Sequence, residues 1–394
     1  MTRPVIGVLG AGAMGSGIAH VALAHGHQVV LADSQAGAAN AARERIAKGF
    51  ARDVEKGRLT QRDTDAALQR LAPADSPAAN LYAAFAPCDL VIEAIVEQLG
   101  AKKAAFAALE AATRDDCMLA TNTSSLSVGA IGSACARPER TLGIHFFNPA
   151  VVMPLVEIVP GVRSDPAVVA RARALVDSWG KTTVLALDTP GFIVNRVARP
   201  FYGEALRILD EGLADISDID WAMTALGGFR MGPFELMDFI GHDVNYVVTE
   251  SVWTALYYDP RFKPSLTQRR LLDAGLLGKK SGRGFYDYAP GAAKPRSAEN
   301  RALGEMILKR ILSMLVNEAA DAVHHRVTSV ADVETAITKG LNYPKGLLAW
   351  GEELGLPVVL AEIDRLYEEY HEDRYRASPL LRQMARTGKS FFND

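Results

Sequence analysis

The sequence predicts an α/β domain with a mostly parallel, doubly wound sheet, followed by two duplicated all-α domains. Three observations support this class. Short apolar runs alternate with helical patterns over the first 188 residues, the periodicity becomes helical after Asp188-Thr189-Pro190-Gly191, and the helical part contains an internal repeat. A chain of 394 residues suffices for two or three hydrophobic cores. We therefore expect domains over residues 1–188, 189–290 and 300–394.

In the first domain, several apolar runs have the length and composition of strands, with helical patterns between them. The strands are VIGVLG, QVVLAD, DLVIEAI, CMLATNTS and TLGIHFF, and the helices include AMGSGIAHVALAHG and EQLGAKKAAFAALEAAT. LVEIVP and TTVLAL follow as later strands. We expect LVEIVP to run antiparallel to TLGIHFF, because only a short turn joins the two.

The helical region repeats itself at a shift of 114 positions, without a gap over residues 196–241. EALRILDEGLADISDIDWAM then lies over EAADAVHHRVTSVADVETAI, so that Glu204 corresponds to Glu318. Matches at this spacing indicate a duplication. The copies differ where Asn195 corresponds to Lys309, and PGAAKPRSAEN between them is typical of a linker.

Composition and charge narrow the function classes. The net charge of −3 gives no general electrostatic attraction to nucleic acid or to an anionic membrane. No window approaches ~20 uninterrupted apolar residues, so we expect no membrane span, and the N-terminus lacks a signal-peptide pattern. Cys88, Cys117 and Cys135 have no CxxC spacing, which is typical of a reducing compartment. We expect a cytoplasmic protein and assign no metal ligand.

A glycine-rich turn follows the first strand. Gly10, Gly12 and Gly15 fit GxGxxG, with Ala13 and Met14 opening the next helix. The first glycine permits a tight turn, the second lets a pyrophosphate approach the backbone, and the third lets helix and strand pack closely. Unpaired N–H groups at the helix start favour phosphates. This context predicts a Rossmann-type dinucleotide site.

Asp33 ends the second strand, eighteen residues after Gly15. A carboxylate at this place can bind both hydroxyls of an adenosine ribose and would repel a 2′-phosphate, and Ser34-Gln35 offer no arginine for such a phosphate. The pattern therefore favours NAD over NADP. The alternative is an ordinary glycine-rich turn with a capping aspartate.

One polar residue lies inside each of two apolar runs in GIHFFNPAVVMPLVEIVP: His145 in the first and Glu157 in the second. If the runs fold back on each other about Val151, these residues face one another. An imidazole with a carboxylate on its far nitrogen is suited to accept the proton of an alcohol that loses hydride to NAD. The alternative is a structural ion pair in the core, and pattern alone leaves both open.

Three further groups have two readings each. TNTSS, with Asn122 and Ser124, follows a strand at its carboxyl end, where ligands bind in open α/β sheets, but it could also cap a helix. Asn195 in PGFIVNR could reach a substrate or be a surface amide. The last group could bind a phosphate-rich substrate or form a solvated helix face, and its residues are Arg43, Arg45, Lys48, Arg52, Lys56 and Arg58.

Taken together, the motifs resemble the L-3-hydroxyacyl-CoA dehydrogenase family. The matching stretches span almost all of residues 1–288 and are GAGAMGSGIA, DLVIEAIVEQLGAKKAAF, TNTSSLSV, GIHFFNPAVVMPLVEIV, DTPGFIVNR, MGPFELMDFIG and GKKSGRGFYDY. The resemblance implies NAD-dependent oxidation of an (S)-3-hydroxyacyl-CoA to a 3-oxoacyl-CoA. It also implies helical domains like the C-terminal part of 6-phosphogluconate dehydrogenase.

The same resemblance assigns roles by position. His145 and Glu157 correspond to the catalytic base and its orienter, and Ser124 and Asn195 to contacts with the substrate oxygen. Asn148 lies near that site, and Lys56 is a looser match to a coenzyme A contact. The cofactor positions implied are Gly10, Gly12, Ala13, Met14, Gly15, Asp33, Glu97, Lys102 and Asn122.

The substrate stays open at this point. The tail, AITKGLNYPKGLLAWGEELG and HEDRYRASPLLRQ, is similar to bacterial 3-hydroxyadipyl-CoA dehydrogenases of phenylacetate breakdown, which usually have more sequence between the helical domains. A 3-hydroxybutyryl-CoA substrate fits nearly as well. A sugar-acid (gulonate-type) dehydrogenase of the same fold and a non-catalytic NAD-binding regulator are the alternatives. We expect the second helical copy to lack an active site and to act as an internal dimerisation partner, with a homodimer also open.

Overall fold

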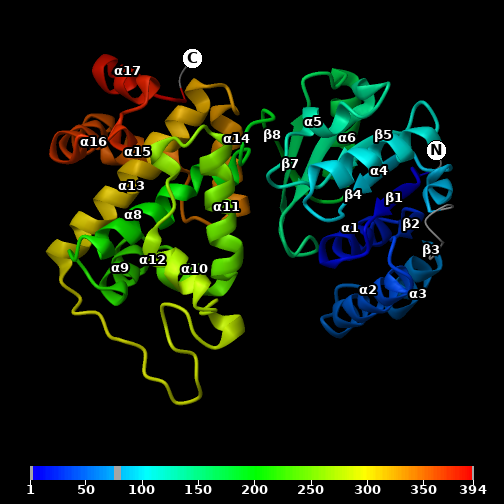
Figure 1. Cartoon of the computed structure of the whole chain (residues 1–394), viewed down its shortest axis with the longest axis horizontal. Coiled ribbons are helices and arrows are strands. Elements are labelled where there is room, and N and C mark those ends of the chain that lie inside the picture. The colour runs from blue at the N-terminus through cyan, green and yellow to red at the C-terminus, as the bar shows by residue number, and fades with distance from the viewer. Residues whose placement is uncertain (1–2, 75–80, 393–394) are drawn as a thin grey trace. The chain divides into compact units, whose positions relative to one another are not determined.

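A computed structural model describes residues 3–74 and 81–392. The chain divides into two compact units, Met1–Thr189 and Pro190–Asp394 (Figure 1). The first holds the sheet and the second is helical. The predicted separation of the second unit into domains over 189–290 and 300–394 stays a prediction.

One eight-stranded sheet forms the centre of the first unit, in the order β3-β2-β1-β4-β5-β6-β7-β8. Only the β6–β7 pair is antiparallel among the strands described, which confirms the expected turn-back of LVEIVP. The strand bounds are β1 Ile6–Leu9, β2 Val29–Ala32, β3 Leu71–Ala74, β4 Leu90–Glu93, β5 Met118–Thr121, β6 Thr141–Phe146, β7 Leu155–Pro160 and β8 Thr182–Leu185.

Helices cover both faces of this sheet. One core gathers apolar residues of α1 (Ala13–Ala24), α2 (Ala38–Glu55) and α6 (Pro166–Asp177) against one face. The other core gathers residues of α4 (Leu99–Ala112) and α5 (Val128–Gly132) against the opposite face. The strands between the two edge strands are therefore buried on both sides, which explains why their sequences are almost continuously apolar.

β3 was not predicted from the sequence. Its residues, LAPA, carry no β-branched or aromatic side chain and include a proline. Proline is tolerated because β3 is the edge strand and pairs only with β2. Two helices, α2 and α3 (Gln61–Gln69), connect β2 to this edge strand. A capping box formed by Thr60 and Asp63 starts α3.

The second unit consists of helices joined by turns, apart from one long connection between α12 and α13. Their bounds are α7 Val194–Val197, α8 Arg199–Asp210, α9 Ile216–Trp221, α10 Pro233–Ile240, α11 His242–Ala255, α12 Leu266–Asp273, α13 Arg301–His324, α14 Val330–Gly340, α15 Leu347–Leu354, α16 Leu356–Tyr370 and α17 Pro379–Thr387, and a π-helical turn at Ala222–Leu226 continues α9. The linker at 290–300 contains neither helix nor strand. Among the residues described, no helix is both long and apolar enough to span a bilayer.

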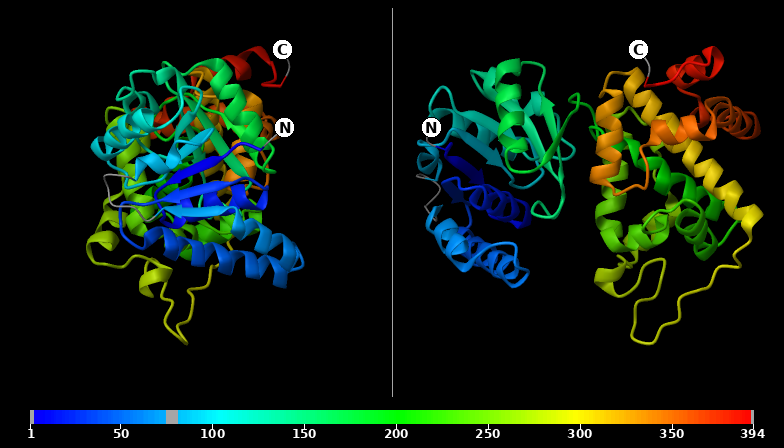
Figure 2. Two further views of the ribbon diagram at one scale, coloured as in Figure 1. Left: turned by 90° about the vertical axis from the view of Figure 1, so that its right-hand side faces the viewer. Right: turned by 180° about the vertical axis from the view of Figure 1, so that it is seen from behind.

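The helices of the second unit recur at the shift of 114 positions. α10 and α15 begin and end at equivalent residues, and so do the α9 region and α14. Asp220 accepts the N–H groups of Phe234 and Glu235 at 2.9 Å each, and Glu334 accepts the equivalent N–H groups at 2.8 and 3.1 Å. α8 and α13, from opposite copies, pack side by side (Figure 1 and Figure 2). Sequence repeat and local structure thus agree over these elements.

Candidate active site

The sheet brings the predicted site residues of the first unit to one edge. β1, β4, β5 and β6 are parallel and end at Leu9, Glu93, Thr121 and Phe146. From β1 the strand order runs one way to β2 and the other way to β4, so the chain reverses direction across the sheet at this point. In open α/β sheets such a switch point leaves a crevice beyond the carboxyl ends, where ligands bind.

The glycine turn after β1 fits a dinucleotide. Gly10 has φ +104°, and a Cβ built on it would lie 2.5 Å from the Ala94 carbonyl oxygen. A Cβ on Gly15 would lie 1.8 Å from the Gly10 carbonyl oxygen, so only glycine at this position lets α1 pack this closely against β1. Gly12, the N-cap of α1, has no described atom within 4 Å of such a Cβ and is exposed. Two glycines are needed for packing and the third leaves the backbone accessible, as a pyrophosphate requires.

The helix start and Asp33 complete this cradle. Ala13 is exposed and Met14 half-buried in the first turn of α1. Asp33 accepts the Ala11 N–H through Oδ2 at 2.7 Å and the Gln35 N–H through Oδ1 at 2.9 Å. Each oxygen of an ionised carboxylate has further acceptor capacity, so these two bonds orient Asp33 and still permit bonds from ribose hydroxyls. The residues present therefore fit NAD.

His145 and Glu157 are paired as the sequence suggested. They are register partners in the β6–β7 ladder, and His145 Nδ1 lies 2.6 Å from Glu157 Oε2. The imidazole is 5% exposed and the carboxylate 0%. A buried carboxylate at this distance fixes Nδ1 as the protonated nitrogen and the ring in one orientation. The geometry serves a base as well as it serves a core ion pair, and position at the ligand edge of the sheet favours the base.

Ser124 lies in a turn that Glu97 holds together. Glu97 Oε1 accepts the Ser124 N–H at 3.0 Å, the Ser125 N–H at 3.1 Å and the Thr123 hydroxyl at 2.6 Å. Burial alone would raise the pKa of Glu97, but these bonds and the neighbouring Lys102 ammonium outweigh it, so the pKa lies below its ordinary value. The helix that follows is capped by Ser127 and not by the TNTSS residues, which removes the capping alternative for Ser124.

Lys102 and Asn122 form contacts that hold the carboxyl ends of the strands and the Glu97 side chain in place. Lys102 is 1% exposed, and its ammonium lies 2.6 Å from Glu93 Oε1 and 3.3 Å from Glu97 Oε2. Because it is buried, we assign it a positioning role through Glu97 in place of the direct cofactor contact first expected. Asn122 Oδ1 accepts the Phe146 N–H at 2.8 Å and so ties the end of β5 to the end of β6.

Sequence reasoning missed Glu93, which is 0% exposed and accepts the Thr121 hydroxyl at 2.7 Å as well as the Lys102 ammonium. The signal was available, because Glu93 is a lone carboxylate within the apolar run LVIEAI, as Glu157 is in LVEIV. Asp188 was also missed: it accepts the N–H groups of Val128 and Gly129 and so caps α5.

The outer predicted residues differ in character. Asn148 follows β6 and is exposed, as is Lys56 at the C-cap of α2. Of the basic residues on α2, Arg45 donates to the Ala11 carbonyl and to Ser16 Oγ, so it braces the glycine turn. The remaining ones are exposed to solvent, as both a phosphate contact and a solvated helix face require.

Asn195 lies in the second unit, on α7, and is half-buried. Its counterpart in the second copy, Lys309, forms an ion pair with Glu362 at 3.0 Å. The second copy therefore uses this position for a salt bridge. No group of three or more potential metal ligands occurs in the part of the chain that the structure describes.

Comparison with known proteins identifies both units. Residues 5–189 match the 3-hydroxyacyl-CoA dehydrogenase NAD-binding domain, and residues 191–288 and 306–390 match the C-terminal domain of the same family. The chain is 38% identical to a 3-hydroxyadipyl-CoA dehydrogenase of Escherichia coli (strain K12), over 96% of this chain and 97% of that one. It is 39% identical to a 3-hydroxybutyryl-CoA dehydrogenase of Bradyrhizobium diazoefficiens, over 74% of this chain and 96% of the relative.

A solved structure has the same fold throughout. The crystal structure of a 3-hydroxybutyryl-CoA dehydrogenase from Escherichia coli K12 superposes with a TM-score of 0.92 at 37% identity, covering 98% of this chain and 99% of that one. The agreement extends over the Rossmann-type unit and the helical unit alike.

Proposed function

The chain belongs to the 3-hydroxyacyl-CoA dehydrogenase family, and from that membership we propose how its own residues carry out NAD-dependent oxidation of an (S)-3-hydroxyacyl-CoA. The observation that carries the proposal is the buried His145–Glu157 pair, 2.6 Å apart, at the same sheet edge as the glycine turn. Bound NAD supplies the acceptor for the hydride that leaves C3 of the substrate.

His145 removes the proton from the substrate hydroxyl as the C3–H bond breaks, so that a C3 carbonyl forms. Because Nδ1 donates to Glu157, the proton is taken by the other ring nitrogen, Nε2. The imidazolium that results carries a positive charge in a site of low exposure, and the Glu157 carboxylate stabilises it. In the reverse direction His145 returns the proton to the carbonyl oxygen.

Ser124 and Asn195 hold the reacting oxygen in this proposal. The Ser124 hydroxyl is presented by a turn that four backbone and side-chain donors bind to Glu97, so its position is fixed. Asn195 supplies an uncharged amide donor from the helical unit. Precise placement matters, because an error of ~1 Å in the reacting geometry lowers the rate strongly.

The cofactor and coenzyme A contacts follow the same logic. Gly10, Gly12 and Gly15 shape the pyrophosphate cradle, and Asp33 takes the adenosine ribose. Ala13, Met14, Glu97 and Asn122 line the path towards the nicotinamide end, with Lys102 behind them. Asn148 near the substrate, Lys56 at coenzyme A and a cytoplasmic location stay predictions.

We further propose that the second helical copy acts as an internal dimer partner for the first. Arg196 donates to Glu318 at 2.7 Å, and Arg310 donates to Glu204 at 3.1 Å. At the shift of 114 positions these two ion pairs are the same pair, formed once in each direction. Such reciprocity is the signature of a twofold interface, here within one chain.

Replacement of the pair tests the mechanism. His145→Gln should retain NAD binding and lose about 10²–10⁴ of kcat, because a positioned base contributes that much. The kcat of Glu157→Gln should also fall steeply, because the imidazole loses its orientation and its charge stabilisation. The measurement is NADH absorbance with 3-hydroxybutyryl-CoA, alongside NAD affinity by calorimetry.

Near-normal turnover of His145→Gln would remove the base assignment. The substrate class is checked by the same assay with free hydroxy acids such as gulonate, on which we expect no turnover. Oxidation of gulonate in preference to acyl-CoA would replace the proposed substrate class with the sugar-acid alternative.

A further inference from the structure

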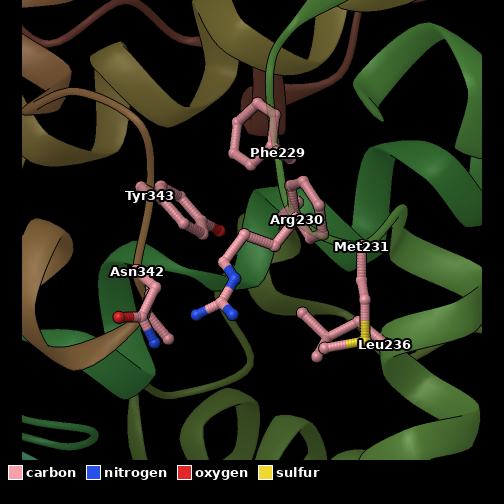
Figure 3. Close-up of a pocket in the computed structure, with 8 residues that line it drawn as sticks. Phe229, Arg230, Met231, Leu236, Asn342 and Tyr343 are labelled. Carbon is pink, nitrogen blue, oxygen red and sulfur yellow. The ribbon is translucent and has the colours of Figure 1, made fainter. Parts of the chain in front are cut away.

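The helical unit contains a pocket of about 330 Å³ with aromatic and apolar walls. Phe201, Phe229 and Tyr343 form one wall, with ring centroids 4.9 Å apart for Phe229–Tyr343 and 5.0 Å for Phe201–Phe229. Met231 and Leu236 line the other side, as Figure 3 shows. Interlocked rings make a wall whose shape is fixed.

Arg230 brings a positive charge into this apolar pocket. Its guanidinium extends into the space between the Asn342 side chain and the Met231–Leu236 side (Figure 3). Arg230 is exposed, and within residues 3–74 and 81–392 no carboxylate or carbonyl binds its guanidinium. By contrast, Arg196 and Arg310 of the same unit are each bound to carboxylates.

The internal repeat supplies a comparison for Arg230. The shift of 114 positions places Phe229 opposite Tyr343, so both copies contribute the equivalent aromatic ring to one pocket. Arg230 itself corresponds to Pro344, and the next residue, Met231, to Lys345, which is ion-paired with Glu353. Only the first copy therefore adds an unneutralised cation at this segment. A duplicated scaffold does not need that charge for packing.

The pocket lies on the helical run that carries Asn195. α7 and α8 are joined through Ala198, which is itself in helical conformation, and Phe201 follows Asn195 by about 9 Å of helical rise. In a six-carbon acyl chain, C3 and the terminal carbon are separated by three bonds, or ~4 Å. An extended arginine side chain and one hydrogen bond can span the remaining distance between the terminal carbon and the helix near Phe201. The length scale suits a short acyl chain with a polar end.

We propose that Arg230 binds a carboxylate at the far end of the acyl chain, so that the preferred substrates are ω-carboxylated 3-hydroxyacyl-CoAs of about six carbons. This inference rests on the proposed function. The guanidinium fork binds a carboxylate through paired charge-assisted hydrogen bonds, and the apolar walls hold the methylenes that lead to it. Asn342 offers a second donor at the rim.

Binding of two matched ligands tests the inference without turnover. Adipyl-CoA and hexanoyl-CoA have the same chain length and differ by the terminal carboxylate. We expect the native protein to bind adipyl-CoA more tightly, by titration calorimetry at low salt. Arg230→Gln should lower the adipyl-to-hexanoyl affinity ratio by about 10–100-fold, the value of a hydrogen bond to a charged group. Arg230→Lys should restore part of it, because a point charge lacks the bidentate fork.

Arg270→Leu is the control, since Arg270 is an exposed arginine of the same unit outside the pocket. The adipyl-to-hexanoyl affinity ratio of this variant should equal that of the native protein. An unchanged ratio in Arg230→Gln would overturn the inference. So would an equal loss of affinity for both ligands, because that result would place Arg230 on the coenzyme A phosphates. Loss of the proposed function shows separately, as absence of NADH formation from any 3-hydroxyacyl-CoA by the native protein.

Discussion

At the residue scale, lone ionisable side chains inside apolar strands were the most informative feature of the sequence. His145 and Glu157 could be paired in advance, because a strand has a period of two and a short turn fixes the register. Glu97 could not be given its contacts, since its partners in the TSS turn lie 26 to 28 residues away. Which carboxylate reaches which loop depends on how β4 and β5 align, and local pattern does not specify that.

Glu97 is predicted to position the turn that carries Ser124. Glu97→Gln should lower kcat about 10-fold, with little change in thermal midpoint, because the side chain is 37% exposed but organises Ser124. The pKa of Glu97 lies below its ordinary value, so its contribution is present at neutral pH and is lost only as pH falls through that lowered pKa. Steady-state kinetics with thermal melts at pH 7 are the measurement.

Glu110→Gln is the matched control for Glu97. Glu110 also accepts two backbone N–H groups, those of Ala136 and Arg137, but on a turn that holds no predicted site residue. Its kcat should stay at the native value. Equal kcat losses in the two variants, or a loss in Glu97→Gln that only follows its melting temperature, would make Glu97 a purely structural residue.

At the element scale, the strands and helices with strong periodicity were predicted and the weak ones were not. β1, β2 and β4 to β8 are apolar runs bounded by turns, whereas LAPA of β3 becomes a strand only because β2 offers it a paired edge. The repeat predicted two equivalent sets of helices in the helical unit. The caps themselves depend on tertiary contacts, as Asp220 reaches the start of α10 from fourteen residues earlier.

Asp220 is predicted to make stability depend on pH. Burial raises the pKa of Asp220 from 3.8 to about 6, against the opposing bonds from Phe234, Tyr286 and Glu235. The folded state thus binds the proton more tightly than the unfolded state, so stability falls as pH rises from about 4 to about 6. This difference in pKa corresponds to roughly 3 kcal/mol of unfolding free energy. Asp220→Asn should abolish this pH dependence of the unfolding free energy, as measured by urea unfolding at pH 4.5 and 7.

Tryptophan fluorescence can follow that transition, because Trp221 adjoins Asp220 in the sequence. Asp218→Asn is the control, since Asp218 binds Ser297 and Ala298 of the linker and leaves Asp220 intact. The control should keep the native difference between the two pH values. If Asp220→Asn keeps it as well, another group carries the titration.

At the scale of the whole molecule, the sequence predicted the repeat of 114 positions and an internal partner role for the second copy, but not which residues pair between the copies. The matches place Arg196 over Arg310 and Glu204 over Glu318, yet nothing local says that each arginine binds the glutamate of the other copy. That cross-pairing arises because α8 and α13 pack against each other. The relative of Bradyrhizobium diazoefficiens aligns over 96% of its own length but over only 74% of this chain, so it is the shorter protein.

A fragment of residues 1–290 is therefore predicted to form a homodimer. Removal of α13 exposes the apolar face of α8, including Phe201 and Ala205, which are fully buried in the whole chain. A second fragment can cover that face, because the reciprocal pairing lets Arg196 bind Glu204 of the partner subunit in both directions. Sedimentation equilibrium should give twice the fragment mass. Glu204→Arg in the fragment should weaken the dimer, because two like charges then face each other. Glu305→Arg in the whole chain, at an exposed site, should leave the sedimentation mass of the whole chain unchanged. A folded, monomeric 1–290 fragment would contradict the internal-dimer interpretation, because the face of α8 would then be stable in water by itself.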